Sequence, residues 1–115
     1  MQDRDGAYLW DMLEAAREAI GFTAGIDFAK FETDRKTQMA VERAVEIVGE
    51  AARRVSDKFK TEHPEVPWKN IVAQRNVLAH EYGEIKQERM WLLTVKHIPD
   101  LIARLEVLVP DKPGP

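Results

Sequence analysis

The chain has 115 residues, 44% hydrophobic and 32% charged, and its 17 basic against 20 acidic side chains leave a formal charge of −3. This balance is typical of one globular domain and argues against a polybasic, histone-like binder of nucleic acid. The absence of Cys excludes disulfide scaffolds, Cys-ligated zinc and thiol catalysis. Since no apolar run approaches the roughly 20 residues of a membrane span, and residues 1–5 are acidic and unlike a signal peptide, we expect a cytoplasmic protein without membrane association.

Apolar residues at three- and four-residue steps predict a first helix. The stripe consists of Leu9, Met12, Leu13, Ala16 and Ile20. We expect Asp3 or Asp5 to cap the start of this helix, and Gly21 or Gly25 to end it. Residues 26–31, which include two phenylalanines, predict a short turn of helix.

A long helix is predicted next, with Asp34 as its cap. Its apolar positions keep a 3.6-residue period over more than 20 residues. They are Met39, Ala44, Val48, Ala51, Ala52, Val55 and Phe59. Residues 63–67 contain two prolines, and we expect them to break the helix.

Helical spacing resumes from Trp68 to about His80, and Gly83 stands where a glycine often ends a helix. A last helix is predicted from about residue 84 to 107. Pro99 lies inside it and should kink it, because the proline ring displaces the carbonyl of the residue four positions earlier.

Together these elements predict an all-α fold, an up-and-down bundle of four main helices plus one short helix. The bundle would form a single domain over residues 1–109, followed by a Pro/Gly tail at 110–115. Four apolar residues lie off the main stripes of the long helix and the last helix: Val41, Val45, Ile47 and Leu93. Because so small a bundle has little interior for them, we expect a second chain to cover the surplus in a homodimer.

Residues 51–80 carry six basic and three acidic side chains, whereas the segments on either side are net acidic. This pattern fits a local anion site or ordinary surface scatter. Four polar residues stand near the end of this segment: Arg75, Asn76, His80 and Tyr82. On a helix, Asn76 and His80 share a face, and the length of Arg75 allows its guanidinium to swing toward the imidazole of His80.

A guanidinium and an imidazole at one helix end suit cleavage of a phosphodiester whose own 2′-hydroxyl is the nucleophile. Arg75 would bind the scissile phosphate and stabilise its developing charge. His80 would move the proton, as a base on the 2′-hydroxyl or as an acid on the leaving oxygen. Asn76 would orient His80 or a phosphate oxygen. No metal-ligand spacing or phosphate-binding loop accompanies these residues, so neither a metal nor a cofactor is expected.

Weaker candidates for contacts with the RNA backbone are Arg53, Arg54 and Lys69.

The pattern Arg75-Asn76-x3-His80-x-Tyr82 resembles the Arg-x4-His-x-Tyr signature of the HepT-like toxins, a branch of the HEPN ribonuclease superfamily. The resemblance extends over residues 4–108. It includes the segments 8–15, 45–52, 64–68, 91 and 98–101. One departure is Ala73-Gln74, where members of the family often have Gly-Met.

The resemblance implies that two chains pair so that both motif helices line one cleft, and that this cleft cuts RNA, not DNA, without a metal. It also implies a partner, a minimal nucleotidyltransferase antitoxin that attaches AMP to Tyr82. The protein would then be the toxin of a type II toxin–antitoxin system. An AMP group on Tyr82 would place anionic phosphates beside Arg75 and His80 and exclude RNA by volume and charge.

Two other classes of protein fit the same residues. One is a non-catalytic HEPN module whose cleft holds a nucleotide or a nucleotidyltransferase partner. The other is a structural four-helix adaptor in which Arg75 caps carbonyls, Asn76 bonds to the backbone and His80 ends the helix. Cleavage of RNA by purified protein in the presence of a chelator separates the nuclease from both. The remaining histidines, His63 and His97, have no suggestive neighbours and are expected on the surface.

Overall fold

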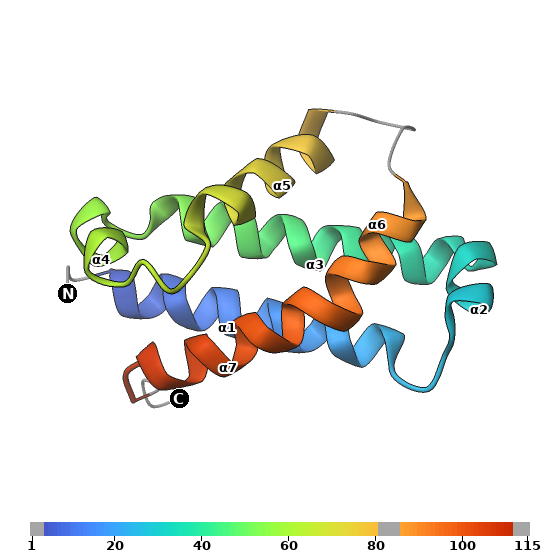
Figure 1. Ribbon diagram of the computed structural model, residues 1–115, viewed down its shortest axis with the longest axis horizontal. Helices are drawn as coiled ribbons and strands as arrows, with labels where there is room; N and C mark the ends of the chain where they lie inside the picture. The colour runs from blue at the N-terminus through green and yellow to red at the C-terminus, as the bar shows by residue number, and fades with distance from the viewer. Residues whose placement is uncertain (1–3, 81–85, 112–115) are drawn as a thin grey trace.

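The computed structural model describes residues 4–80 and 86–111, without the side chains of Val77, Ala79 and His80, and every regular element within these residues is helical. The long helices are α1 (Asp5–Thr23), α3 (Arg35–Arg54), α5 (Trp68–His80) and a C-terminal helix made of α6 (Gln87–Leu92), the π-helical segment η1 (Leu93–His97) and α7 (Ile98–Leu108). Two short helices join them, α2 (Phe28–Thr33) and α4 (Asp57–Glu62). Figure 1 shows the long helices running in alternate directions. The predicted all-α fold is therefore confirmed, with two short helices instead of one.

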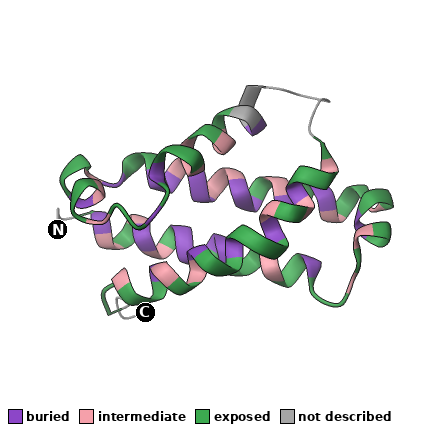
Figure 2. Cartoon of the chain, in the orientation of Figure 1, coloured by how far each residue is buried: buried purple, intermediate pink, exposed green. Residues whose placement is uncertain are grey.

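The main core lies where α1, α3 and α7 pack together. Its fully buried side chains include Leu9, Met12, Leu13, Val48 and Leu105. Burial of an aliphatic side chain of this size contributes about 1.5–3 kcal/mol. In Figure 2 the buried residues of α1 and α3 lie along the sides on which these two helices face each other. This interior is the apolar stripe that the sequence predicts.

A second apolar cluster lies at the other end of α3 and corrects one expectation. Val41 and Val45 are buried there within the single chain, together with Phe31, Leu78 and Met90. These two valines therefore do not require a second chain to cover them. The large apolar side chains that remain exposed are different ones: Phe22, Met39, Leu92, Val95 and Val107. Met39, which the period placed in the core, is 56% exposed.

The start of α1 differs from the expectation. Arg4 occupies the N-cap position without a side-chain hydrogen bond. Asp5 is buried in the first turn, and its carboxylate accepts hydrogen bonds from the backbone nitrogen of Ser56 at 2.8 Å and from its hydroxyl at 2.7 Å. Asp5 thus ties α1 to the junction of α3 and α4 instead of capping its own helix. Asp3 lies outside the described residues, and Gly25, with a φ of 79°, follows the end of α1 as predicted.

Asp34 caps α3 as predicted, because its carboxylate accepts a hydrogen bond from the backbone nitrogen of Thr37 at 3.1 Å. The helix is shorter than expected, however, and ends at Arg54. Ser56 then caps α4 by accepting from the nitrogen of Phe59. A serine that satisfies the first turn of a new helix interrupts the old one, although the apolar period continues through the break.

The C-terminal helix changes its winding just before Pro99. The backbone N–H of Ile98 donates to the carbonyl of Leu93, five residues earlier, at the end of the π-helical segment η1. Pro99 then occupies the first turn of α7, where a missing N–H costs least. The sequence predicts a kink at Pro99, and the change that the structure shows there is this π-helical segment, which ends one residue before Ile98.

Candidate active site

The helix that carries the motif, α5, packs on α3 at a point of very close approach. A Cβ atom built on Gly49 would lie 2.1 Å from the Cβ and 2.9 Å from the Cγ of Arg75, and 3.1 Å from the carbonyl oxygen of Ile71. Only a residue without a side chain fits there. Gly49 therefore sets how closely α5 approaches α3, and with it the place from which the Arg75 side chain starts.

The guanidinium of Arg75 lies over α3. Its Nη2 is 3.0 Å from Oε2 of Glu50, and its Nη1 donates to the amide oxygen of Asn76 at 3.1 Å. The Arg75 Nε and Oε2 of Glu50 are both buried and have no hydrogen-bond partner, so the contact with Glu50 is an ion pair without hydrogen-bond geometry. Arg75 is thus anchored by a carboxylate of the neighbouring helix and by the next residue of its own, and it does not cap backbone carbonyls in this arrangement.

Glu50 is the centre of a cluster of arginines. Its other oxygen, Oε1, accepts hydrogen bonds from Nη2 of Arg53 at 2.9 Å and from Nε of Arg54 at 3.1 Å. The hydrogen bond from Arg53 is the largest influence that lowers the pKa of Glu50, with Arg54 and the charge of Arg75 adding to it. One carboxylate therefore faces three guanidinium groups, which leaves an excess of positive charge beside the motif helix.

A surface cavity of about 430 Å³ opens beside Arg75. Its lining comes from α1, α3 and α5 and consists of Tyr8, Asp11, Arg43, Glu46, Ile47, Glu50, Ala51, Arg54 and Arg75. Arg43 and Glu46 form an ion pair of their own at 3.1 Å. The lining thus contains three carboxylates and three guanidinium groups, and the excess of positive charge around Glu50 comes from Arg53, which lies outside the lining.

The predicted site residues fall into three groups. The structure brings Arg75 and Asn76 into contact, and Asn76 is exposed on α5. The backbone of His80 ends α5, but its side chain and the whole of Tyr82 and Gly83 lie outside the described residues. Among the weaker candidates, Arg54 lines the cavity beside Arg75, Arg53 shares its carboxylate partner, and Lys69 is exposed near the start of α5.

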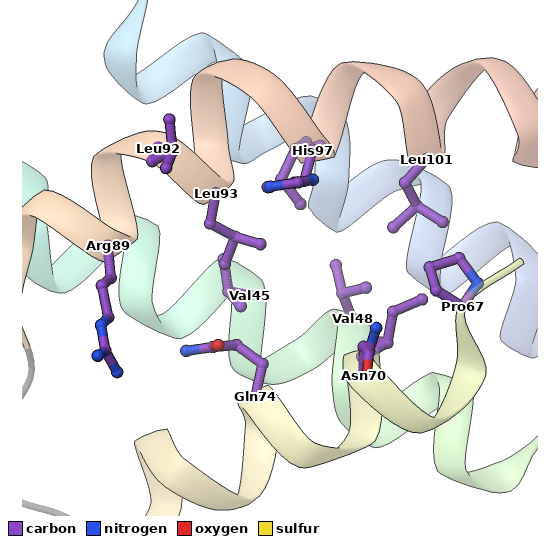
Figure 3. A pocket seen from close by; sticks show the side chains of 12 residues that line it. Val45, Val48, Pro67, Asn70, Gln74, Arg89, Leu92, Leu93, His97 and Leu101 are labelled. Atoms are coloured by element: carbon purple, nitrogen blue, oxygen red, sulfur yellow. The ribbon is translucent and has the colours of Figure 1, made fainter.

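A second cavity, of about 340 Å³, separates α5 from the C-terminal helix. Figure 3 shows Leu93 pointing into it from the C-terminal helix, opposite Gln74 and Asn70 of α5, with Val45 and Val48 of α3 at its base. The two helices therefore stand apart on this side of the bundle. Gln74, one of the two residues that depart from the family pattern, also donates its amide to the sulfur of Met90 at 3.9 Å.

Neither of the other histidines lies in the arginine cluster around Glu50, although His97 lines the second cavity (Figure 3). His97 is exposed, whereas His63 is half-buried, packs on the ring of Phe59 at 4.3 Å and lies 3.2 Å from Glu65. Across the described ranges, no three His, Asp or Glu side chains gather closely enough to hold a metal ion. None of the helices in this part of the chain is long and apolar enough to cross a membrane.

Comparison with known proteins assigns the chain to a family. The family model described as ribonuclease HepT-like matches residues 12–108. The chain belongs to the HepT-like ribonuclease family. No solved structure matches the chain.

Three relatives illustrate this membership. A protein of Methanocaldococcus jannaschii, named as a candidate RNase, is 38% identical over 109 residues that cover 94% of this chain and 100% of that protein. A second candidate RNase of the same organism is 36% identical over 108 residues, or 94% of this chain and 89% of that protein. A protein of Thermococcus cleftensis, named as a candidate ribonuclease HepT, is 40% identical over 101 residues, or 88% of this chain and 92% of that protein.

Two residues near Arg75, Gly49 and Glu50, were not predicted from the sequence as part of the site. Gly49 and Glu50 belong to the stretch 45–52 that resembles the family, yet neither was assigned to the site. The only signal available was a glycine inside a strongly amphipathic helix, which often marks a close approach between helices. The partner across that approach, Arg75, emerges only once α5 is packed on α3.

Proposed function

We propose that this HepT-like protein is the toxin of a type II toxin–antitoxin system and cleaves RNA as a metal-independent endoribonuclease. The observation that carries the proposal is the presence of Arg75, Asn76 and His80 on one helix of a chain that the family model matches over most of its length. RNA is the substrate class that the family implies. Arg75 lies beside Arg53 and Arg54, with which it shares the carboxylate of Glu50, and this excess of guanidinium groups supports a role in binding phosphate.

The proposed reaction uses the RNA's own 2′-hydroxyl as the nucleophile. The 2′-oxygen forms a bond to the adjacent phosphorus, the bond from phosphorus to the 5′-oxygen breaks, and the products are a 2′,3′-cyclic phosphate and a 5′-hydroxyl. His80 removes the proton from the 2′-hydroxyl or supplies one to the leaving 5′-oxygen. Arg75 binds the phosphate and stabilises the charge that develops on its oxygens. Asn76, which contacts Arg75, orients a phosphate oxygen or His80.

The active form we propose is a homodimer in which both copies of α5 line a shared cleft. The separation of α5 from the C-terminal helix, and the exposed Leu92 and Val95 nearby, support this arrangement because they leave apolar surface beside the motif helix. Light scattering at micromolar concentration should give twice the mass of one chain. A fully active monomer would exclude the shared cleft.

Replacing the motif residues tests the catalytic assignment. His80→Ala and Arg75→Ala should each abolish RNA cleavage and growth arrest while circular dichroism shows an unchanged helical fold. Cleavage by the original protein should persist in EDTA and leave cyclic phosphate ends. Full toxicity of a folded His80→Ala protein would refute the nuclease assignment, and a strict requirement for Mg²⁺ would refute the metal-independent mechanism. A folded protein that binds a nucleotide or a nucleotidyltransferase but never cleaves RNA would favour the non-catalytic module.

We further propose that a minimal nucleotidyltransferase antitoxin neutralises the toxin in the cytoplasm by transferring AMP to Tyr82. The Tyr82→Phe protein keeps the ring and loses the acceptor oxygen. It should therefore resist neutralisation, and its intact mass should show no added AMP after co-expression with the antitoxin. An AMP group that persists on the Tyr82→Phe protein and maps to another residue would overturn this assignment.

A further inference from the structure

We infer that Glu50 is the positioning residue for Arg75: a carboxylate on α3, itself held by two arginines of its own helix, anchors the guanidinium on α5. The inference rests on the proposed ribonuclease activity for its kinetic consequence, but the anchoring itself belongs to the protein alone. Three observations carry it, namely the division of the Glu50 oxygens, the close helix approach at Gly49, and the burial of the atoms that meet.

The two oxygens of Glu50 bind different partners. Oε1 accepts from Arg53 and Arg54, which lie three and four residues later on the same helix. Oε2 accepts no hydrogen bond and faces Arg75 as an ion pair, at 3.0 Å from its Nη2. Both hydrogen bonds to Oε1 come from the same helix as Glu50. They therefore orient the carboxylate independently of α5. The carboxylate then holds Oε2 in a fixed orientation toward α5. Residues that support a functional side chain commonly orient it in this way.

This ion pair is only partly exposed to solvent. The side chains of Arg75 and Glu50 are 25% and 30% exposed, and Oε2 and the Arg75 Nε are each shielded from solvent. Gly49 brings the α3 backbone against the Cβ and Cγ of Arg75, so the base of the side chain cannot move toward α3. With its base blocked by Gly49 and its tip held by Glu50 and Asn76, the guanidinium is confined to a narrow range of positions.

Such confinement has a kinetic signature. A group that is held in place before substrate arrives lowers the barrier of the chemical step, so its release reduces kcat. The loss of a partner that orients a functional group typically costs about 10- to 100-fold. Removing a negative charge beside an RNA site, by contrast, favours binding of the polyanion and lowers KM. Glu50→Gln should therefore reduce kcat at least about tenfold without raising KM.

Glu46→Gln is the matched control. Glu46 lies one helical turn before Glu50 and lines the same cavity, but its ion-pair partner is Arg43 and not Arg75. Its substitution by Gln removes the same negative charge as Glu50→Gln. Glu46→Gln should lower KM, as Glu50→Gln does, while its kcat stays within about twofold of that of the original protein. If Glu50→Gln and Glu46→Gln give the same kcat as the original protein, Glu50 acts only through its charge and the inference is overturned.

A measurement without RNA separates this inference from the proposed function. The N–H signal of the Arg75 Nε, assigned by its disappearance in Arg75→Lys, should exchange slowly with water because this atom is buried. Its exchange should accelerate in Glu50→Gln and stay unchanged in Glu46→Gln. An unchanged rate in folded Glu50→Gln would overturn the anchoring. If the original protein cleaves no RNA, the proposed function fails while this test still decides the anchoring.

A second variant covers the case in which Glu50→Gln does not fold. Arg53→Gln combined with Arg54→Gln alters two side chains that are more than half exposed, and it removes both bonds to Oε1. Glu50 can then rotate, and the exchange of the Arg75 Nε proton should again accelerate. An unchanged exchange rate of this proton in the double variant would show that Arg53 and Arg54 do not orient Glu50. It would thereby overturn the inference.

Discussion

Substitution of Gly49 by alanine perturbs the site at the place where α3 and α5 meet. The added Cβ would lie 2.1 Å from the Cβ of Arg75, whereas carbon atoms in contact need about 3.5–4.0 Å, so the helices must separate by about 1.5 Å. The carbonyl oxygen of Ile71, at 3.1 Å, is backbone and cannot rotate away. Overpacking of this kind costs about 1–3 kcal/mol, against about 1 kcal/mol that alanine gains over glycine inside a helix.

We therefore expect Gly49→Ala to lower the free energy of unfolding by up to about 2 kcal/mol, or Tm by up to about 8 °C. Because the motif helix moves with Arg75, kcat for RNA cleavage should also fall by about tenfold or more. Gly21→Ala is the matched control, since Gly21 lies in a helix with nothing within 4 Å of an added Cβ. That variant should be stabilised by up to about 1 kcal/mol with unchanged activity.

Urea unfolding followed by circular dichroism, together with an RNA cleavage assay, measures both effects on both variants. A Gly49→Ala protein that is stabilised as much as Gly21→Ala and retains full kcat would refute the close approach of α3 and α5. A protein that is destabilised but keeps its kcat would show that the position of Arg75 does not depend on this approach.

Two further predictions concern stability. Asp5→Ala removes the carboxylate that accepts two hydrogen bonds from Ser56 and should cost about 2 kcal/mol in urea unfolding, whereas a loss below about 0.5 kcal/mol would contradict the tie between α1 and α4. The pKa values of Asp34, Glu50 and Glu65 are lowered from 3.8, 4.5 and 4.5 by hydrogen bonds, chiefly from Thr37, from Arg53 and from the backbone of Glu65 respectively. A lowered carboxyl pKa stabilises the fold fully above its ordinary value, and this contribution is lost as pH falls through the lowered value. The urea midpoint should therefore stay level with respect to these groups from pH 7 to about 5 and fall below about 4.5, and a midpoint that rises on acidification would contradict these contacts.

Much of the helical architecture follows from local patterns in the sequence. Asp34 caps α3 because a carboxylate at that position accepts the first unpaired N–H groups whatever the rest of the chain does. Pro99 lies in the first turn of α7, directly after the π-helical segment, where a residue without an N–H is best tolerated. The break at residues 63–67 is equally local. The residue range of α5, which includes Arg75, was predictable for the same reason.

Residues whose partners lie far along the chain were assigned wrongly or not at all. Asp5 looked like a cap for α1, yet it binds Ser56, 51 residues later. Val41 appeared surplus because the sequence shows one stripe per helix, whereas α3 meets different neighbours on its different sides and buries Val41 within the chain. Such errors arise because periodicity shows which face of a helix is apolar but not which elements surround it.

The sequence by itself therefore determined the all-α class, the cap of α3 at Asp34, the break at residues 63–67, the family, and the presence of Arg75 and Asn76 on one helix. The tertiary structure decided the surroundings of Arg75. A glycine in α3 allows α5 to approach, and the following glutamate holds the guanidinium with an oxygen that its own helix leaves unoccupied. This difference has a physical cause: caps and prolines act within a few residues of the chain, whereas an ion pair between helices exists only after both helices have packed.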